Sequence, residues 1–158
     1  MGTLSLPFET VSPRQEMGAY EYLWTLTKQT SKKLADLFAD KPDSMPSDWV
    51  NEANAEEYAN RALEQVHEAD LMHFGVRLFD TGDYPCQLSE ANHPLRLLYY
   101  SGNWDLVYNR SVAVVGTRKP SEEGILRTKK LTRKLSEDGY TIVSGLAQGI
   151  DRIVHETA

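Results

Sequence analysis

The N-terminal part of the chain carries side chains at helical spacing. The segment Ser12–Gln15 (SPRQ) predicts a helix start, because Ser is a good N-cap, Pro suits the first helical position and Gln follows three residues after the cap. Positions three or four residues apart then form one side of the predicted helix. They are Met17, Tyr20, Leu23, Trp24 and Thr27.

Two further helices are predicted before residue 75. A short helix is expected over Lys32–Asp40, with Ser31 as its N-cap. A third is expected to begin at Asn54, where Glu57 holds the capping-box position, and to run to about Met72. Together the three helices predict a small bundle. Their predicted buried side chains are Leu34, Leu37 and Phe38 in the second helix and Tyr58, Ala62, Leu63 and Val66 in the third.

The hydrophobic pattern changes after Gly75. Val76–Phe79 alternates as a short strand does, and Leu95–Tyr100 is a second extended segment. This change predicts a domain boundary at Gly75. We therefore expect an N-terminal helical domain over residues 1–74 and a second domain over residues 75–158.

The last third of the chain has the clearest pattern. It predicts a buried strand over Val112–Val115, a helix over Ser121–Ser136 and a second strand over Tyr140–Val143. Two strands joined by a helix are typical of a parallel βαβ unit. The expected fold class is therefore α/β, with the small helical domain first.

Charge is distributed unevenly along the 158 residues. The net charge is −6, and 41% of the residues are hydrophobic, as in a globular protein. Residues 1–109 carry 8 basic and 17 acidic residues, whereas residues 110–158 carry 9 and 6. A polyanionic partner is therefore plausible for the C-terminal part alone.

Other compositional features favour a cytoplasmic protein. No apolar run exceeds four residues, whereas a membrane span needs about 20. The first residues lack the basic and apolar regions of a secretory leader. The single cysteine, Cys86, has no second cysteine with which to form a disulfide. We therefore expect no membrane association.

The predicted parallel strands are each followed by a loop that contains glycine. In open α/β sheets, ligands bind at the carboxyl ends of the strands. Gly116 and Gly145 follow the two strands and lack a Cβ, so a phosphate can approach the backbone amides. Arg118 offers a guanidinium that matches phosphate oxygens, and Thr117 offers a hydroxyl. These residues predict an anion site.

The same loops disfavour several kinds of site. Their glycines match neither the dinucleotide fingerprint nor the Walker pattern, which disfavours ordinary NAD or ATP binding. Asp151 and His155 could both bind a metal ion, but no third candidate ligand accompanies them, so no metal site is expected. No nucleophile elbow surrounds Ser144. We therefore expect no cofactor, no metal and no catalytic residue.

These segments resemble the DNA-processing protein A family (DprA, also called Smf). The resemblance covers about residues 60–158, and residues 1–50 resemble the helical N-terminal domain of the family only loosely. The segments that carry it follow the order and spacing of the family. They are Asp83–Pro85 with Leu88, Pro94 with Leu98–Gly102, Val112–Arg118 with Pro120 and Gly124, and Ser144–Asp151 with His155.

The resemblance implies an extended Rossmann-like domain that binds single-stranded DNA. Members of the family protect incoming DNA during natural transformation, load the recombinase RecA and form homodimers, and no catalysis is implied. They continue well beyond the position of Ala158, so this chain resembles a truncated member that lacks the RecA and dimerisation surfaces. The residues carried over as phosphate-binding are Gly116, Thr117 and Arg118 in the first loop and Ser144, Gly145, Gly149 and Asp151 in the second.

Two other functions remain open from the sequence. Rossmann-like nucleotide phosphoribohydrolases, which resemble the so-called lysine-decarboxylase family, also place glycine-rich loops around a phosphate, but their Pro-Gly-Gly-x-Gly-Thr motif is absent here. A protein-interaction module is the third possibility, in which the helices bind a partner and the βαβ unit is a scaffold. Salt-dependent binding distinguishes DNA binding from the third function, and nucleotide turnover identifies the second.

Overall fold

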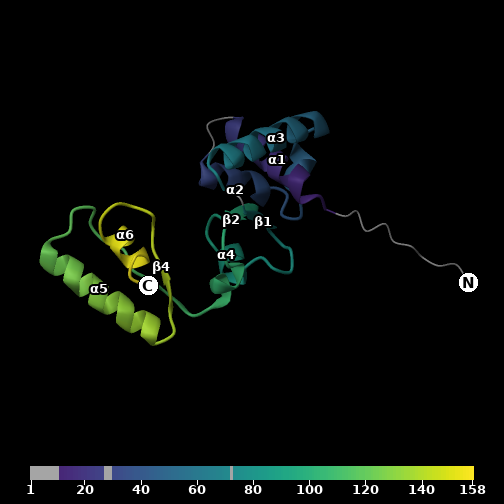
Figure 1. Ribbon diagram of the computed structural model, residues 1–158. Helices are drawn as coiled ribbons and strands as arrows, with labels where there is room; N and C mark the ends of the chain where they lie inside the picture. The colour runs from purple at the N-terminus through teal and green to yellow at the C-terminus, as the bar shows by residue number, and fades with distance from the viewer. Residues whose placement is uncertain (1–10, 27–29, 72) are drawn as a thin grey trace, which may run out of the picture. The chain divides into compact units, whose positions relative to one another are not determined.

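The computed structural model describes residues 11–26, 30–71 and 73–158 (Figure 1). The chain divides into two compact units, one up to Gly102 and one over Asn103–Ala158. Each unit is described by itself. Within the described ranges, no helix is long and apolar enough to cross a membrane.

The first helix, α1, spans Pro13–Thr25 and confirms the predicted start. The hydroxyl of Ser12 accepts a hydrogen bond from the amide of Gln15, at 3.5 Å. Three of the predicted positions, Met17, Tyr20 and Leu23, are buried. Thr27, which was predicted on the same side, lies outside the described residues.

The next two helices exist as predicted, but each begins earlier. Helix α2 spans Ser31–Ala39, and its cap is Thr30 rather than Ser31. After the 3₁₀ helix η1 (Pro46–Trp49), helix α3 spans Glu52–Glu68. The predicted start at Asn54 is wrong, because Asn51 is the cap and accepts a hydrogen bond from the Asn54 amide at 2.9 Å. The predicted end at about Met72 is wrong, because the helix ends at Glu68 with Ala69 as its C-cap.

Helices α1 and α3 pack closely through small residues. The buried residues of α3 are Ala55, Ala59 and Ala62. A Cβ on Gly18 of α1 would lie 2.7 Å from the Ala59 backbone nitrogen, so only glycine fits at this contact. Of the predicted positions on α3, Ala62 is fully buried, and the larger side chains are half-buried.

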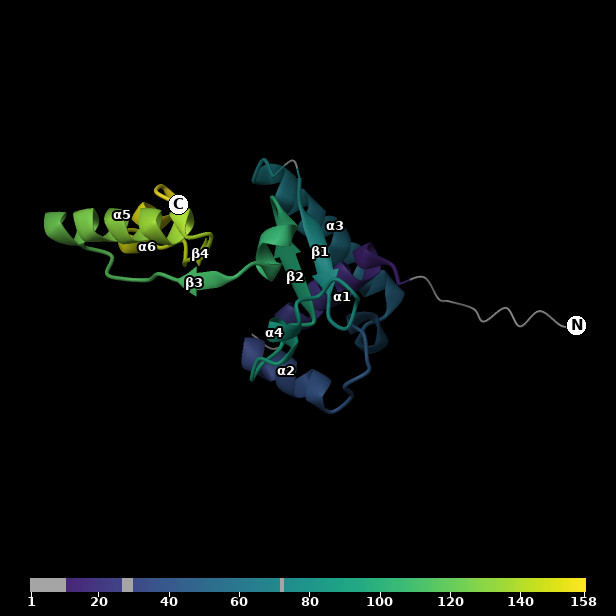
Figure 2. The ribbon, with the colours of Figure 1, turned by 90° about the horizontal axis from the view of Figure 1, so that it is seen from below.

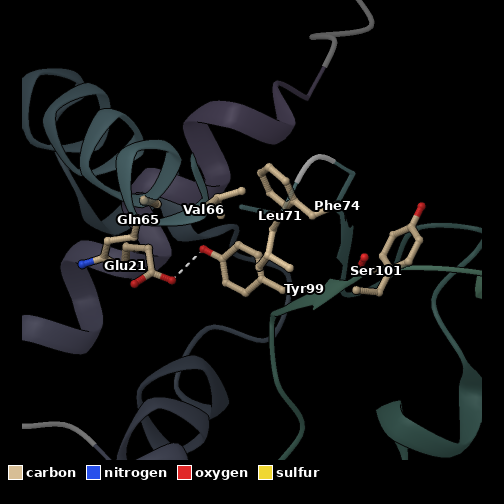
Figure 3. Close-up of a pocket in the computed structure, with 9 residues that line it drawn as sticks. Glu21, Gln65, Val66, Leu71, Phe74, Tyr99 and Ser101 are labelled. Carbon is tan, nitrogen blue, oxygen red and sulfur yellow. Dashed lines mark hydrogen bonds between the residues drawn. The ribbon is translucent and has the colours of Figure 1, made fainter. Parts of the chain in front are cut away.

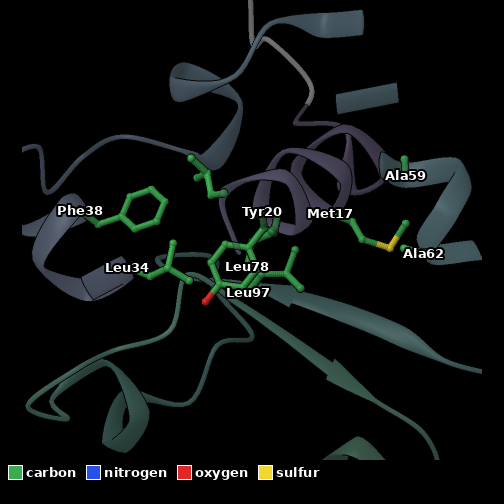
Figure 4. Close-up of a cluster of buried hydrophobic side chains, with 9 residues drawn as sticks. Met17, Tyr20, Leu34, Phe38, Ala59, Ala62, Leu78 and Leu97 are labelled. Atoms are coloured by element: carbon green, nitrogen blue, oxygen red, sulfur yellow. The ribbon is translucent and has the colours of Figure 1, made fainter. Parts of the chain in front are cut away.

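Two antiparallel strands complete the core of this unit. Strands β1 (Gly75–Leu78) and β2 (Leu97–Tyr100) pair with Leu78 opposite Leu97, and the short helix α4 (Cys86–Ser89) lies between them in the chain. Figure 4 shows these two leucines with side chains from the helices. The buried cluster comprises Met17, Tyr20, Leu23, Leu34, Phe38, Ala59, Ala62, Leu78 and Leu97.

Arg96 joins the second helix to the strands. Its side chain is 8% exposed and lies between two rings, 5.0 Å from the Phe38 centroid and 4.1 Å from the Phe79 centroid. It also donates a hydrogen bond to the Phe38 carbonyl at 3.4 Å. The strands after residue 75 thus share a core with the helices. The predicted domain boundary at that residue stays a prediction.

The second unit contains the predicted βαβ arrangement. Strand β3 (Ser111–Ala113) pairs in parallel with β4 (Thr141–Val143), and helix α5 (Glu122–Glu137) connects them (Figure 2). The hydroxyl of Ser121 caps α5 by accepting from the Gly124 amide at 3.2 Å. The α/β fold class is therefore confirmed. The unit also holds the 3₁₀ helix η2 (Trp104–Tyr108) and helix α6 (Ile150–His155).

The second unit buries few side chains. Ile150 and Val154 of α6 and Thr132 of α5 are buried. Large apolar side chains in both loops and on α5 remain exposed, up to 92% for Leu146. The other exposed large apolar side chains of this unit are Leu106, Val107 and Tyr108 in η2, Val115, Leu126 and Leu131, and Val143 at the end of β4.

Candidate functional site

The loops that follow the two parallel strands meet, as the sequence predicted. The amide of Ile150, at the end of the second loop, donates a hydrogen bond to the Thr117 carbonyl in the first loop at 3.1 Å. Gly149 has φ +94°, and a Cβ there would lie 2.7 Å from the Arg118 Cα. The backbones of the two loops therefore touch at a position that requires glycine.

Asp151 forms a second link between the loops. Its Oδ1 accepts a hydrogen bond from the Gly116 amide at 3.3 Å. A Cβ on Gly145 would lie 2.7 Å from its Oδ2. The side chain is 7% exposed, so the carboxylate lies inside the junction rather than on its surface.

Two hydroxyls of the predicted site bind within the protein. Ser144 donates to the Val114 carbonyl at 2.6 Å, which attaches the second loop to the first strand segment. The hydroxyl of Thr117 accepts from the Lys119 amide at 3.2 Å. Both hydroxyls therefore form hydrogen bonds within the protein that help to hold the loops in shape.

Several backbone donors of the loops remain unpaired. Among the residues that the structure describes, none accepts a hydrogen bond from the amides of Thr117 and Arg118 or from those of residues 145–149. The Gly116 amide differs, because it binds Asp151. Amides left free and accessible at a loop surface suit an anion.

Arg118 is the cation closest in sequence to these donors. Its side chain is exposed, and no carboxylate within the described residues pairs with it or with Lys119. Some other cations of the unit already form ion pairs. Arg127 pairs with Glu123, and the pKa values of Lys134 and Arg152 are raised by hydrogen bonds to Asp138 and Glu156 respectively.

A cavity of about 460 Å³ adjoins the second loop. Its walls come from the loop and from one side of α6, and they mix apolar and polar groups. Three of its lining residues, Leu146, Ala147 and Gln148, also carry free loop amides. The cavity therefore extends the surface available to a ligand. It is lined by Leu146, Ala147, Gln148, Arg152, His155 and Glu156.

A cavity in the first unit has a different character (Figure 3). It measures about 400 Å³, and its walls include Val66, Leu71 and Phe74. Glu21 accepts a hydrogen bond from the Tyr99 hydroxyl at 2.6 Å, and burial, followed by this hydrogen bond, raises the tyrosine pKa. An apolar cavity with a carboxylate does not suit an anion. The loops of the second unit are therefore the better candidate for binding phosphate.

Metal ligands do not gather in the parts of the chain that the structure describes. No group of three or more His, Cys, Asp or Glu side chains is placed to hold an ion there. One residue that builds the loop junction was not predicted from the sequence. Ile150 packs where a Cβ on Gly116 would lie, 2.7 Å from its Cγ1. Its place directly after Gly149, at the start of α6, was the available signal.

The second unit has the form of a Rossmann-like α/β domain, with glycine loops at the carboxyl ends of parallel strands. The sequence model of the DNA recombination-mediator protein A family matches residues 75–158. That is more than half of the chain. The chain belongs to the DNA recombination-mediator protein A family.

Individual relatives agree with this assignment. Protein Smf of Synechocystis is 42% identical over 82 residues, and the DNA processing protein DprA of Streptococcus pneumoniae is 45% identical over 75 residues. These matches cover 49% and 48% of this chain but only 21% and 26% of the relatives. The chain thus spans about a quarter or less of the curated relatives that it matches.

A solved structure extends the likeness beyond the matched sequence. The X-ray structure of DprA from Streptococcus pneumoniae superposes with a TM-score of 0.51 and 29% sequence identity. The match covers 93% of this chain and 49% of that one. The shared fold therefore includes the helical first unit as well as the βαβ unit.

Proposed function

We propose that this protein is a single-stranded DNA-binding recombination mediator, which protects incoming DNA and loads RecA during natural transformation. The two joined loops bind the phosphates of the strand. The observation that carries the proposal is a set of loop amides that have no acceptor among the described residues, in the same loops as the exposed Arg118, which pairs with no described carboxylate. Membership of the recombination-mediator family supports it.

The chemistry of the loops suits a DNA backbone. Backbone amides and a guanidinium recognise phosphate without reading bases, which suits binding that tolerates any sequence. In this proposal the amides of Thr117, Arg118 and Gly145 donate to phosphate oxygens. Gly116, Ser144 and Gly149 hold the loops in shape through the contacts described above.

The proposal includes no chemical step. The hydroxyl of Ser144 donates to a backbone carbonyl rather than to a histidine, so it has no base to activate it as a nucleophile. RecA loading and association of two copies rest on the family resemblance alone.

A binding measurement tests the proposal. Fluorescence anisotropy of a labelled oligo-dT should show binding by the 158-residue chain that weakens as salt rises. The reason is that basic side chains neutralise phosphates and so release the counterions condensed on the strand. Replacing Arg118 with Ala should lower the affinity about tenfold and reduce the salt dependence by about one counterion. The matched control is Arg127→Ala, which removes the same charge from a residue already paired with Glu123.

Two outcomes would contradict the proposal. One is a folded chain, verified by circular dichroism, that does not bind the oligonucleotide. The other is an equal loss of affinity in the Arg118 and Arg127 variants, which would indicate a diffuse charge effect instead of a site at the loops. Release of a base from a nucleoside monophosphate would instead support the phosphoribohydrolase alternative.

A further inference from the structure

Asp151 places a negative charge inside a site that is otherwise suited to anions. Its carboxylate is buried, and its hydrogen-bond partner is the Gly116 amide. In the described parts of the chain no Lys, Arg or His forms an ion pair with it. Burying a carboxylate without a cation costs free energy, so its presence at this position needs a physical explanation.

The carboxylate lies between the two sets of free amides. It touches Gly116 at the start of the first loop and approaches Gly145 at the start of the second. An anion held by the amides that follow these two glycines therefore lies near Asp151. A carboxylate cannot donate a hydrogen bond to phosphate, so direct binding, which the family resemblance implied, is not the favoured role.

We propose that Asp151 positions the two loops and that its charge makes the site discriminate against doubly charged phosphate monoesters. The ligand class that remains is the singly charged phosphodiester, the internal linkage of a DNA strand. This inference rests on the proposed function, namely that the loops bind phosphate. It adds a reason why the site takes a polymer backbone rather than a free nucleotide.

The physical basis is that repulsion scales with the product of the charges. A phosphate monoester carries nearly two negative charges above its second pKa of about 6, whereas a phosphodiester carries one. Solvent and salt screen the exposed guanidinium of Arg118 more strongly than they screen a buried carboxylate. Removing the carboxylate charge should therefore favour the monoester more than the diester.

Two small ligands isolate the effect of charge. Thymidine 5′-phosphate is doubly charged at pH 8, and its methyl ester is singly charged but otherwise similar. Titration of the full chain with each, followed by NMR on the loop amides, gives both dissociation constants even when binding is weak. The variants are Asp151→Asn, which keeps the size and the acceptor, and Asp151→Ala, which removes both.

The proposal predicts unequal gains in affinity for the two ligands. Asp151→Asn should strengthen binding of the monoester about tenfold and of the methyl ester about threefold, because the lost repulsion is twice as large for the first. The matched control is Glu137→Gln, which removes one negative charge at the far end of α5. This control should change the dissociation constant of neither ligand by more than about twofold.

A second readout tests the positioning role. Hydrogen exchange of the Gly116 amide should accelerate in Asp151→Ala, because the amide loses its acceptor. It should stay slow in Asp151→Asn, whose side-chain oxygen still accepts. Equal acceleration in both variants overturns the positioning role.

The charge role has its own contrary results. It is overturned if Asp151→Asn lowers the affinity for either ligand, raises the affinity for both equally, or leaves neither ligand with measurable binding. These failures are separate from failure of the proposed function. Oligo-dT binding that depends on Arg118, together with equal effects of Asp151→Asn on the two small ligands, would keep DNA binding and reject the discrimination, whereas unequal gains in affinity without oligo-dT binding would do the reverse.

Discussion

Ser47 donates two hydrogen bonds to the buried carboxylate of Glu16. Its backbone amide reaches Oε2 at 2.9 Å and its hydroxyl reaches Oε1 at 2.6 Å. Glu16 lies on α1 and is only 4% exposed, whereas Ser47 lies in η1. The carboxylate thus attaches the segment between α2 and α3 to the first helix, with both oxygens satisfied.

Removing this carboxylate should destabilise the first unit. We expect Glu16→Ala to lower the free energy of unfolding by about 2–3 kcal/mol, because the half-buried amide and hydroxyl of Ser47 lose a charged acceptor. Urea denaturation followed by circular dichroism measures the change. The control, Glu57→Ala, removes an exposed carboxylate paired with Arg61 and should have a much smaller effect. Similar losses in both variants would contradict the importance of the buried contact.

The close contact of α1 and α3 makes a second prediction. Gly18→Ala should destabilise the chain by about 3 kcal/mol, because the added Cβ meets the backbone of α3 and the helices must separate. Gly82→Ala is a matched control, since nothing lies within 4 Å of a Cβ there. Thermal unfolding of the two variants should differ clearly. A tolerated Gly18→Ala would show that the helices are not held this closely.

The helix starts show which parts of the fold the sequence specifies locally. Ser12 was predicted as a cap from the adjacent residues, and its hydroxyl accepts the expected amide; Ser121 was predicted as the first helical residue and is instead the cap. Asn51 and Asn54 are both plausible caps in the sequence. The structure selects Asn51, and the helix that it caps packs Ala55 and Ala59 against Gly18. Alanines gave no hydrophobic signal as strong as Tyr58 or Val66.

The candidate site was predictable in outline and not in its internal contacts. Strand–glycine–helix patterns placed Gly116 and Gly145 at one edge of a parallel sheet, and the strands do pair in parallel. The bond from the Gly116 amide to Asp151 spans 35 positions of the chain. No local pattern encodes such a contact, so the inward orientation of Asp151 needed the structure.

Gly149 provides a test of the loop junction. Gly149→Ala should reduce oligo-dT affinity about tenfold or more, because a Cβ at φ +94° is strained and would collide with the backbone of Thr117 and Arg118. Gly139→Ala shares the positive φ, at +81°, but its Cβ would meet nothing within 4 Å. It should cost about 1 kcal/mol of stability and leave affinity unchanged. Anisotropy and thermal unfolding distinguish the two, and equal affinities would count against the junction.

Alkaline pH should weaken the first unit. Burial raises the pKa of Tyr20 to about 12, and burial also raises the pKa of Tyr84. The fold therefore favours the neutral phenols, and the stability that they contribute is complete below pH 10. It is lost as the pH rises from about 10 to 12.

Tyr20→Phe should reduce this alkaline loss by about 1.4 kcal/mol between pH 8 and pH 11. At pH 8 the variant should be as stable as the wild type or slightly more so, because the buried hydroxyl has no hydrogen-bond partner in the described structure. Urea denaturation at pH 8 and pH 11 measures both effects. A variant with the wild-type loss between these two values would exclude Tyr20 as a cause.

The first turn of α6 belongs to the loop junction. Ile150 begins the helix and donates to Thr117, and Asp151 follows it. A helix of six residues is not stable alone, so its folding and the assembly of the loops are one equilibrium. A ligand at 100 times its dissociation constant stabilises the bound form by about 2.7 kcal/mol. Occupation of the loops should therefore slow hydrogen exchange of the α6 amides, although the ligand contacts the loops and not the end of the helix.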